Sequence, residues 1–263
     1  MKTAAPKMNL APVFYTLAQV QFNPIAQMSV YVDRVQEHLR RNGFPDFREE
    51  NLFELAIRRL DEPQPDVRPQ KHVRWSFTNT QRTEGYLLLS NALVFHTTKY
   101  DTFTKFLEKT ILGLNLIHET VELAYVEKIG LRYLDAIVPA EDDTLQQYLN
   151  PSLMGFSANP EGCLGHSYTE TVTGIAGGNL SVRAVITDGS LALSPDLTPL
   201  QLELQPRFKE VNRRNAVLDA DYCVVKRSNF DLVEIQEQLT RSHDIITETF
   251  KISVTDYARE RWA

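Results

Sequence analysis

The sequence predicts an α+β protein built on mostly antiparallel sheets. Several short segments of alternating apolar and polar residues are joined by tight turns, which only antiparallel neighbours allow, because a parallel pair needs a crossover of about a dozen residues. Two long amphipathic segments, at 102–120 and 229–250, each follow such a run of strands and are expected to pack on the sheet. The hydrophobic fraction of 43% and the charged fraction of 24% are ordinary for a globular chain.

The first 70 residues predict a strand, a helix, a second strand and a loop. Residues 13–22 alternate and stop at Asn23-Pro24. Residues 28–41 carry apolar side chains at helical spacing and are followed by Asn42-Gly43, a typical helix terminator. Residues 52–60 predict the second strand. The segment from Asp61 to Gln70 is expected to be a loop because it contains three prolines, Pro63, Pro65 and Pro69.

A run of strands and a long helix follow. Strands are predicted at 72–79, 86–90 and 93–97, with a turn at Asn91-Ala92. Asp101 is expected to accept hydrogen bonds from the first turn of the helix at 102–120. Residues 125–137 then predict a long strand, since apolar side chains alternate along it.

The order of the predicted elements indicates two lobes. Residues 1–138 predict an N-terminal α+β lobe, 139–162 a linker or inter-lobe excursion containing an acidic run and two prolines, and 163–263 a C-terminal α+β lobe. One continuous domain is the alternative. The halves are alike only in the order of their elements, which leaves a duplication open.

The C-terminal lobe is expected to begin with a hairpin, 164–175 and 179–187, around Gly177-Gly178. Strands at 200–206 and 217–226 precede the helix at 229–250, for which Ser228 and Asp231 form a variant capping box. Thr255 is expected to cap a short last helix that ends at Trp262.

Composition excludes some classes of protein. The net charge of −6 argues against a broad nucleic-acid footprint, although a local basic patch remains compatible with it. Cys163 and Cys223 are interpreted as two thiols rather than a disulfide, because nothing in the sequence indicates a secretory context. The N-terminus lacks the apolar run of a signal peptide, and no stretch approaches the length of a membrane span, so we expect a cytoplasmic protein without a membrane partner.

The sharpest group of polar residues is Asp219 and Asp221 in the strand at 217–226. Residues two apart on a strand face the same way, so the two carboxylates are expected to lie side by side. They would need a cation, an arginine or a shared proton to relieve their repulsion, and Mg²⁺ or Mn²⁺ suits such oxygen ligands. The alternative that we favour is a solvated strand face or a pairing with arginine, since no third ligand stands at a recognisable spacing.

Arg132 faces away from the apolar stripe of its strand. It could bind an anion, but we expect it to pair internally with Asp219, Asp221 or Glu203, because a partly buried guanidinium needs a carboxylate partner.

Two histidines invite comparison with catalytic motifs and match none. His118 and Glu122 lack the second histidine of a zinc-protease helix, and exposed helical charge explains them better. His243 stands next to the apolar stripe of the last long helix and is interpreted as a core or interface histidine. The glycines at 174–178 form a hairpin turn and not a phosphate loop, so we predict no metal, no cofactor and no catalytic residue.

Three segments together resemble a known family. They are 73–77 with 100–103, then 129–135, and then 218–221 followed by His243-Asp244 and 250–255. In this order they are similar to a sporadically distributed prokaryotic family of proteins of about this length, to which no activity has been assigned. The resemblance implies an accessory gene of a mobile or defence-type locus and supplies no catalytic residues. It draws attention to Arg132, Tyr133, Asp219 and Asp221, which lie in the matching segments.

Three functions follow as hypotheses. The favoured one is a non-enzymatic binding or regulatory protein that acts through a protein partner or through a homodimer, since no catalytic set is present. The alternatives are a nucleic-acid-binding accessory protein, and a metal-assisted hydrolase or phosphotransferase that uses Asp219 and Asp221. Whether the chain is an enzyme stays open, and the candidate binding residues are Arg132, Tyr133, Asp219, Asp221 and His243.

Overall fold

The computed structural model describes residues 10–58, 66–158, 164–197 and 200–263, which form one nine-stranded antiparallel sheet covered by helices. The strand order is β2-β3-β4-β5-β1-β6-β9-β8-β7. The prediction of an α+β fold with an antiparallel sheet is therefore confirmed.

The strands are β1 (Val13–Phe22), β2 (Asp46–Arg58), β3 (Asp66–Thr78), β4 (Glu84–Leu89), β5 (Ala92–Thr97), β6 (Tyr125–Ile137), β7 (His166–Ile175), β8 (Gly178–Gly189) and β9 (Arg213–Asn229). The helices are α1 (Met28–Arg41), α2 (Phe103–Val121), α3 (Leu145–Tyr148), α4 (Pro151–Met154), α5 (Pro206–Lys209), α6 (Leu232–Ser253) and α7 (Asp256–Trp262), with short 3₁₀ turns η1 (Gly155–Ala158) and η2 (Pro195–Leu197).

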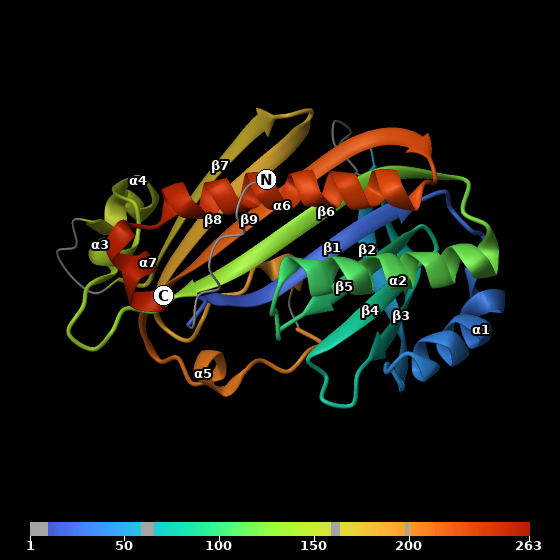
Figure 1. Ribbon diagram of the computed structural model, residues 1–263, viewed down its shortest axis with the longest axis horizontal. Helices are drawn as coiled ribbons and strands as arrows, with labels where there is room; N and C mark the ends of the chain where they lie inside the picture. The colour runs from blue at the N-terminus through green and yellow to red at the C-terminus, as the bar shows by residue number, and fades with distance from the viewer. Residues whose placement is uncertain (1–9, 59–65, 159–163, 198–199) are drawn as a thin grey trace.

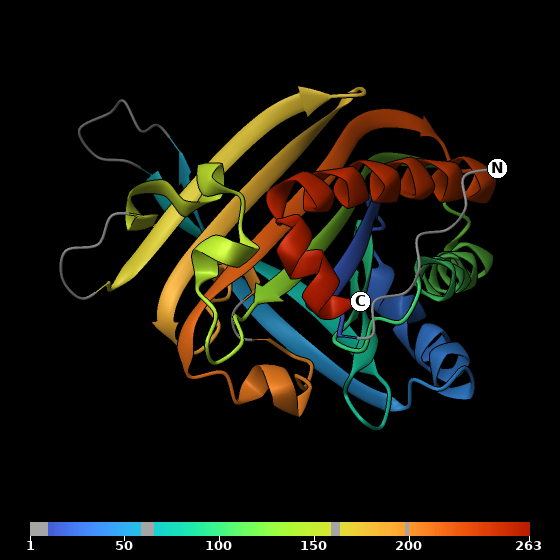
Figure 2. The same ribbon diagram turned by 60° about the vertical axis from the view of Figure 1, so that its left-hand side comes forward.

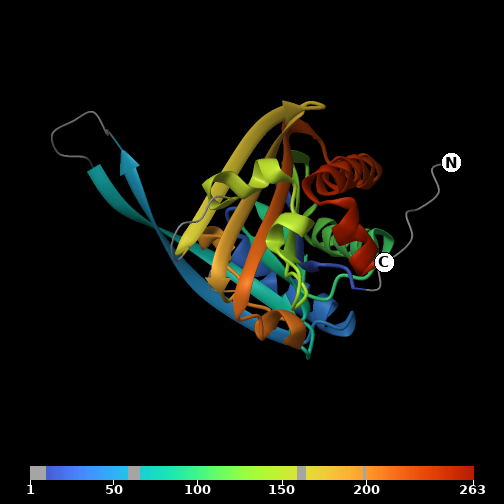
Figure 3. The same ribbon diagram turned by 90° about the vertical axis from the view of Figure 1, so that its left-hand side faces the viewer.

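Three helices cover one face of the sheet. Figure 1 shows α2 and α6 in front of the strands, and Figure 3 shows these helices and α1 together on one side. Their apolar stripes meet the sheet in one core, in which Phe106, Leu114, Ile235 and Leu239 are buried. We call the face of the sheet opposite to α1, α2 and α6 the open face.

One end of the open face is crossed by a segment that we call the strap, residues 190–197 and 200–212. Leu202 and Phe208 of the strap pack with Phe14, Leu134 and Val217 in a separate apolar cluster. A further cluster, formed by α3, α4 and α7 with β8 and β9, closes the end of the helix face.

The strands of both predicted lobes belong to the same sheet. β1 to β6 come from residues 1–138 and β7 to β9 from residues 163–263, and the two sets join where β6 pairs with β9. In this pairing Arg132 lies opposite Asp221, and Leu134 lies opposite Asp219. The pairing brings together the charged residues that the sequence analysis singled out from distant segments.

The loop predicted from Asp61 to Gln70 is partly wrong, because β3 begins at Asp66 and includes Pro69. Residues 59–65 lie outside the described part of the chain. Pro69 is opposite Leu55 of β2, whereas β4 pairs with β3 only from Trp75 onward. On the side of β3 that faces away from β2, Pro69 has no strand partner, so its missing N–H leaves no ladder hydrogen bond unformed there. A strand tolerates proline at such an edge position. Figure 3 shows this part of the β2–β3 hairpin projecting from the sheet.

The strand predicted at 200–206 is also wrong. This stretch has no strand partner and crosses the open face as part of the strap. Its backbone is bonded irregularly, with Glu203 N donating to Arg82 O at 2.7 Å and Thr98 Oγ1 donating to Glu203 O at 2.6 Å. The alternating leucines fit a strand pattern, but they pack onto a sheet whose neighbouring strands are already paired with one another.

Both long helices begin with caps other than those predicted. Thr102 caps α2 by accepting from Lys105 N, while Asp101 pairs with Lys105 Nζ at 2.6 Å. Asp231 caps α6 by accepting from Val233 N and Glu234 N, and it replaces the predicted Ser228. The predicted cap at Thr255 is confirmed, since its side chain accepts from Ala258 N.

Among the described residues, none of the helices combines the length and the apolar character that crossing a membrane requires.

Candidate functional site

A buried arginine–aspartate pair lies on the open face where β6 meets β9. Arg132 Nε donates to Asp219 Oδ1 at 2.8 Å, and Arg132 Nη2 donates to Asp219 Oδ2 at 2.7 Å. Both residues are buried, with exposed fractions of 5% and 0%. Burial by itself lowers the pKa of Arg132, but the hydrogen bonds to Asp219 and Asp196 outweigh it and raise this pKa above its ordinary value. The internal pairing expected for Arg132 is present, with Asp219 and not with Glu203.

Two residues of the strap form hydrogen bonds with this pair. Asp196 of η2 accepts a short hydrogen bond from Arg132 Nη1, and Ser194 Oγ donates to Asp219 Oδ2 at 3.0 Å. Burial raises the pKa of Asp196, yet the hydrogen bond and charge of Arg132 outweigh burial and hold this pKa below its usual value. The side chain of Asp196 is 62% exposed, so the strap joins the buried pair from the solvent side.

The charge network continues to the edge of the sheet. Arg183 of β8 approaches Asp219 with Nη1 at 3.4 Å from Oδ2, and its Nε donates to Glu170 Oε1 of β7 at 2.7 Å. One charged side chain from each of the strands β6, β9, β8 and β7 therefore takes part in this network. The charged side chains of this network pair with one another.

Asp221 lies on the same face but takes a different position. It is opposite Arg132 in β6 and Ser181 in β8, and it is half-buried. Burial raises its pKa, against the charge of Arg132, which lowers it. Asp219 has both carboxylate oxygens bound to Arg132, and among the described residues no three His, Cys, Asp or Glu side chains are grouped as a metal would require.

Tyr133 and His243 form a second cluster on the opposite, helix-covered face. Successive strand residues point to opposite faces, so Tyr133 diverges from Arg132. Its hydroxyl lies 3.2 Å from His243 Nδ1 and 3.2 Å from the hydroxyl of Tyr100. The ring of Phe103 stacks on His243 with centroids 4.0 Å apart. Burial lowers the pKa of His243 and raises that of Tyr133, so it favours the neutral form of both side chains. The five candidate binding residues therefore form two separate groups.

Sequence reasoning missed a buried carboxyl group and a buried tyrosine–histidine pair. Asp135 continues the face of Leu131 and Tyr133, and burial, with a smaller contribution from Asp219, raises its pKa to about 7. On the open face, Tyr15 Oη lies 2.8 Å from His96 Nδ1, and burial lowers the pKa of His96 to about 3. The signal for Asp135 was available, because a carboxylate interrupts an otherwise apolar alternation.

The other histidine and basic motifs have local explanations. His118 stacks on Phe230 with centroids 4.4 Å apart. The basic pair Arg40 and Arg41 shares one carboxylate, that of Glu37, at 2.8 and 2.6 Å. Cys163 lies outside the described residues, and Cys223 is a free, partly buried thiol.

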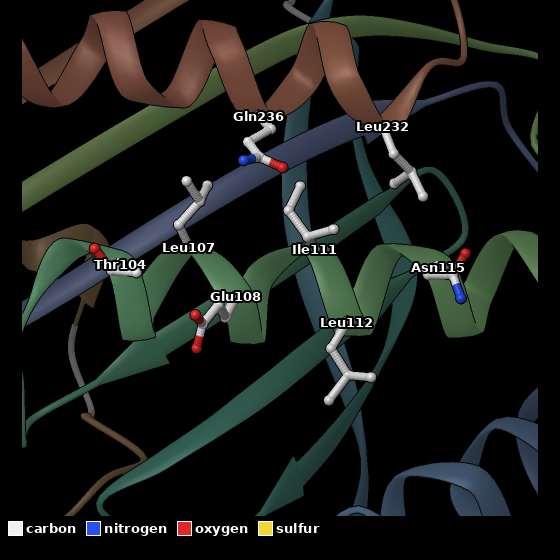
Figure 4. Close-up of a pocket in the computed structure, with 8 residues that line it drawn as sticks. All are labelled: Thr104, Leu107, Glu108, Ile111, Leu112, Asn115, Leu232 and Gln236. Atoms are coloured by element: carbon white, nitrogen blue, oxygen red, sulfur yellow. The ribbon is translucent and has the colours of Figure 1, made fainter.

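A shallow groove of about 460 Å³ runs between α2 and α6. Figure 4 shows Leu107 and Ile111 of α2 facing Gln236 of α6 across it, with Leu232 near one end. Its lining combines apolar side chains, such as Leu107 and Ile111, with polar ones, such as Glu108. None of the five candidate binding residues lines the groove.

The edge strand β7 is exposed along most of its length. It is outermost in the sheet, as Figure 1 and Figure 2 show, and each of residues 170–175 is exposed. Tyr168, Val172 and Ile175 expose 54%, 63% and 43% of their surface. Within the described ranges, β8 is its only ladder partner.

The turn after β7 determines which of its backbone groups point outward. Ala176 and Gly177 have φ of 50° and 80°, so they form a two-residue turn of the type favoured in hairpins, closed by Ile175 opposite Gly178. Such a closing pair is hydrogen-bonded, and bonded pairs alternate along an antiparallel ladder. Thr173, Thr171 and Thr169 therefore bond to β8. The N–H and C=O groups of Tyr168, Glu170, Val172 and Gly174 point away from the sheet.

Comparison with known proteins assigns no function to either cluster or to the edge. A scan against protein-family models finds no matching family, and a search of curated proteins finds no relative.

Proposed function

We propose that this chain is a non-enzymatic binding protein that captures an extended segment of a protein partner along the edge of β7. The observation that carries the proposal is a ten-residue edge strand whose outward backbone groups have no ladder partner among the described residues. Adding a strand satisfies such groups and is a recurrent mode of protein recognition.

Natural edge strands are usually protected by charges, prolines or bulges. The opposite edge follows this rule, because β2 carries Arg48, Glu49 and Glu50 in succession. β7 differs, since from Tyr168 to Ile175 its only charged side chain is Glu170, which Arg183 neutralises at 2.7 Å. The contrast between the edges supports a binding role for β7.

The charged residues of the open face support a non-enzymatic role. Arg132, Arg183, Asp219 and Asp196 are bound to one another, so a reacting group would have to break buried pairs to use them. We also infer that each half of the chain is a run of antiparallel strands followed by a long helix. In this arrangement β7 is the outermost strand of the second half. The family resemblance and the cytoplasmic location stay predictions of the sequence.

The proposal is tested by blocking the edge without disturbing the hairpin. Val172→Pro removes an N–H that points away from β8, whereas the matched variant Val225→Ala alters an exposed valine of β9 that is not on the edge. Both variants and the wild type are immobilised and exposed to extract of the native host, and captured proteins are identified by mass spectrometry.

We expect a discrete captured protein, which is the chain itself or another, to be retained by the wild type and by Val225→Ala and lost with Val172→Pro. Amide hydrogen exchange of the complex should show new protection in residues 168–174. Capture that is equal on all three proteins would reject the β7 edge as the binding surface.

A further inference from the structure

We propose that the strand added to β7 is β7 of a second copy, in an antiparallel register centred on Thr171. This inference rests on the proposed function and specifies its partner. Two copies related by a twofold axis through the sheet would join their sheets edge to edge, with the open faces continuous.

The outward backbone groups restrict the possible registers. Tyr168, Glu170, Val172 and Gly174 must face one another as hydrogen-bonded pairs, which holds for a symmetric centre on any residue of β7. Only the centres on Glu170 and Thr171 pair nine residues of the strand, 166–174 and 167–175. A centre on Glu170 places two carboxylates directly opposite, which is destabilising. A centre on Val172 pairs only residues 169–175 of β7, whereas a centre on Thr171 pairs 167–175. Charge and length together select Thr171.

The side chains complement each other in this register. Thr171 meets Thr171 of the second copy, and Thr169 meets Thr173, which are favourable cross-strand pairs. Glu170 faces Val172 and keeps its own partner Arg183. Tyr168 faces Gly174, around which an added Cβ would meet nothing within 4 Å, so there is room for the aromatic ring of the second copy.

A pair of substitutions at one position tests the register. In the proposed dimer, residue 172 of each copy faces Glu170 of the other, so each substitution acts twice. Val172→Glu should weaken the dimer by roughly tenfold through like-charge repulsion, and Val172→Lys should leave it unchanged or tighten it. The dimer dissociation constant is measured by sedimentation velocity over a concentration series.

A cross-link tests the same register independently. In a chain in which Cys163 and Cys223 are replaced by serine, Thr171→Cys places two thiols at a non-hydrogen-bonded pair, where a disulfide can form across the interface. The matched variant Thr173→Cys places its two thiols four residues apart along the strands. Non-reducing electrophoresis after mild oxidation should give a covalent dimer with Thr171→Cys only.

The outcomes separate this inference from the proposed function. A wild-type chain that is monomeric at every concentration, or a dimer that Val172→Glu leaves intact, overturns a second copy as the partner of the β7 edge. The proposed function then depends on whether Val172→Pro abolishes capture of a different protein. Equal weakening by glutamate and lysine at position 172 overturns the Thr171 register.

Discussion

Arg132 and Asp219 form a buried bidentate pair, and this has a cost that appears when one of them is removed. Two buried charges in bidentate contact are tolerable, but a single buried guanidinium without its carboxylate is strongly destabilising. Asp196 contacts the same arginine from the solvent side and should matter much less.

We therefore expect Asp219→Asn to lower the free energy of unfolding by about 3 kcal/mol or more. Asp196→Asn serves as the matched control and should cost about 1 kcal/mol or less, because one partner is largely exposed. Urea denaturation at pH 7 measures both values. Similar small losses in the two variants would show that Asp219 does not compensate a buried charge.

The buried carboxyl group of Asp135 should give the free energy of unfolding an unusual dependence on pH. Its folded-state pKa of about 7 is above the unfolded value, so between about pH 4 and pH 7 the folded state holds a proton that the unfolded state has released. The stability from this group is present below pH 4 and is lost as the pH rises toward 7. Asp135→Asn removes this loss, since the amide is neutral throughout.

The measurement is the difference in free energy of unfolding between Asp135→Asn and the wild type at pH 5 and at pH 8. The variant should gain relative to the wild type as the pH rises, by at most about 1.4 kcal/mol per pH unit across the window. A difference that stays constant with pH would show that Asp135 titrates normally in the fold.

Among the elements, α6 illustrates how a helix start is decided. Ser228 and Asp231 are both good capping residues in sequence, but β9 continues through Asn229 and uses Ser228 in the ladder opposite Val126. The side chain of Asp231, at 2.7 and 3.1 Å from the first free N–H groups, is left to cap the helix.

Asp231→Ala should accordingly lower the melting temperature through the loss of about 1 kcal/mol, and Ser228→Ala should have little effect. Differential scanning calorimetry compares the two variants. A larger effect at Ser228 would mean that the helix begins one turn earlier in solution.

For the whole molecule, the pairing of β6 with β9 should make the two sequence halves unfold together. The chain has two tryptophans, with Trp75 in β3 and Trp262 in α7, so each half carries its own fluorescence reporter. Trp75→Phe and Trp262→Phe leave one reporter each.

In urea titrations, the fluorescence and the far-UV circular dichroism of each single-tryptophan variant should give the same midpoint, as expected for one cooperative unit. If in each variant the fluorescence midpoint differs from the circular dichroism midpoint, the two halves are independent lobes.

The sequence by itself determined the elements whose signals are local. β1, α1 and β6 lie at the residues predicted, because apolar periodicity and turn residues act within a few positions of one another. It also determined that Asp219 and Asp221 share a face, which follows from the two-residue period of a strand.

Only the tertiary structure decided how those elements combine. The attachment of Asp196 to Arg132 and the exposure of β7 both depend on which strands pair and which remain at the edge. The strap shows why the sequence was insufficient. Its alternating leucines predict a strand, but the neighbouring strands are already paired with one another and leave no ladder position for it. Pairing across long sequence separations depends on the whole set of available partners, and local patterns contain no information about that set.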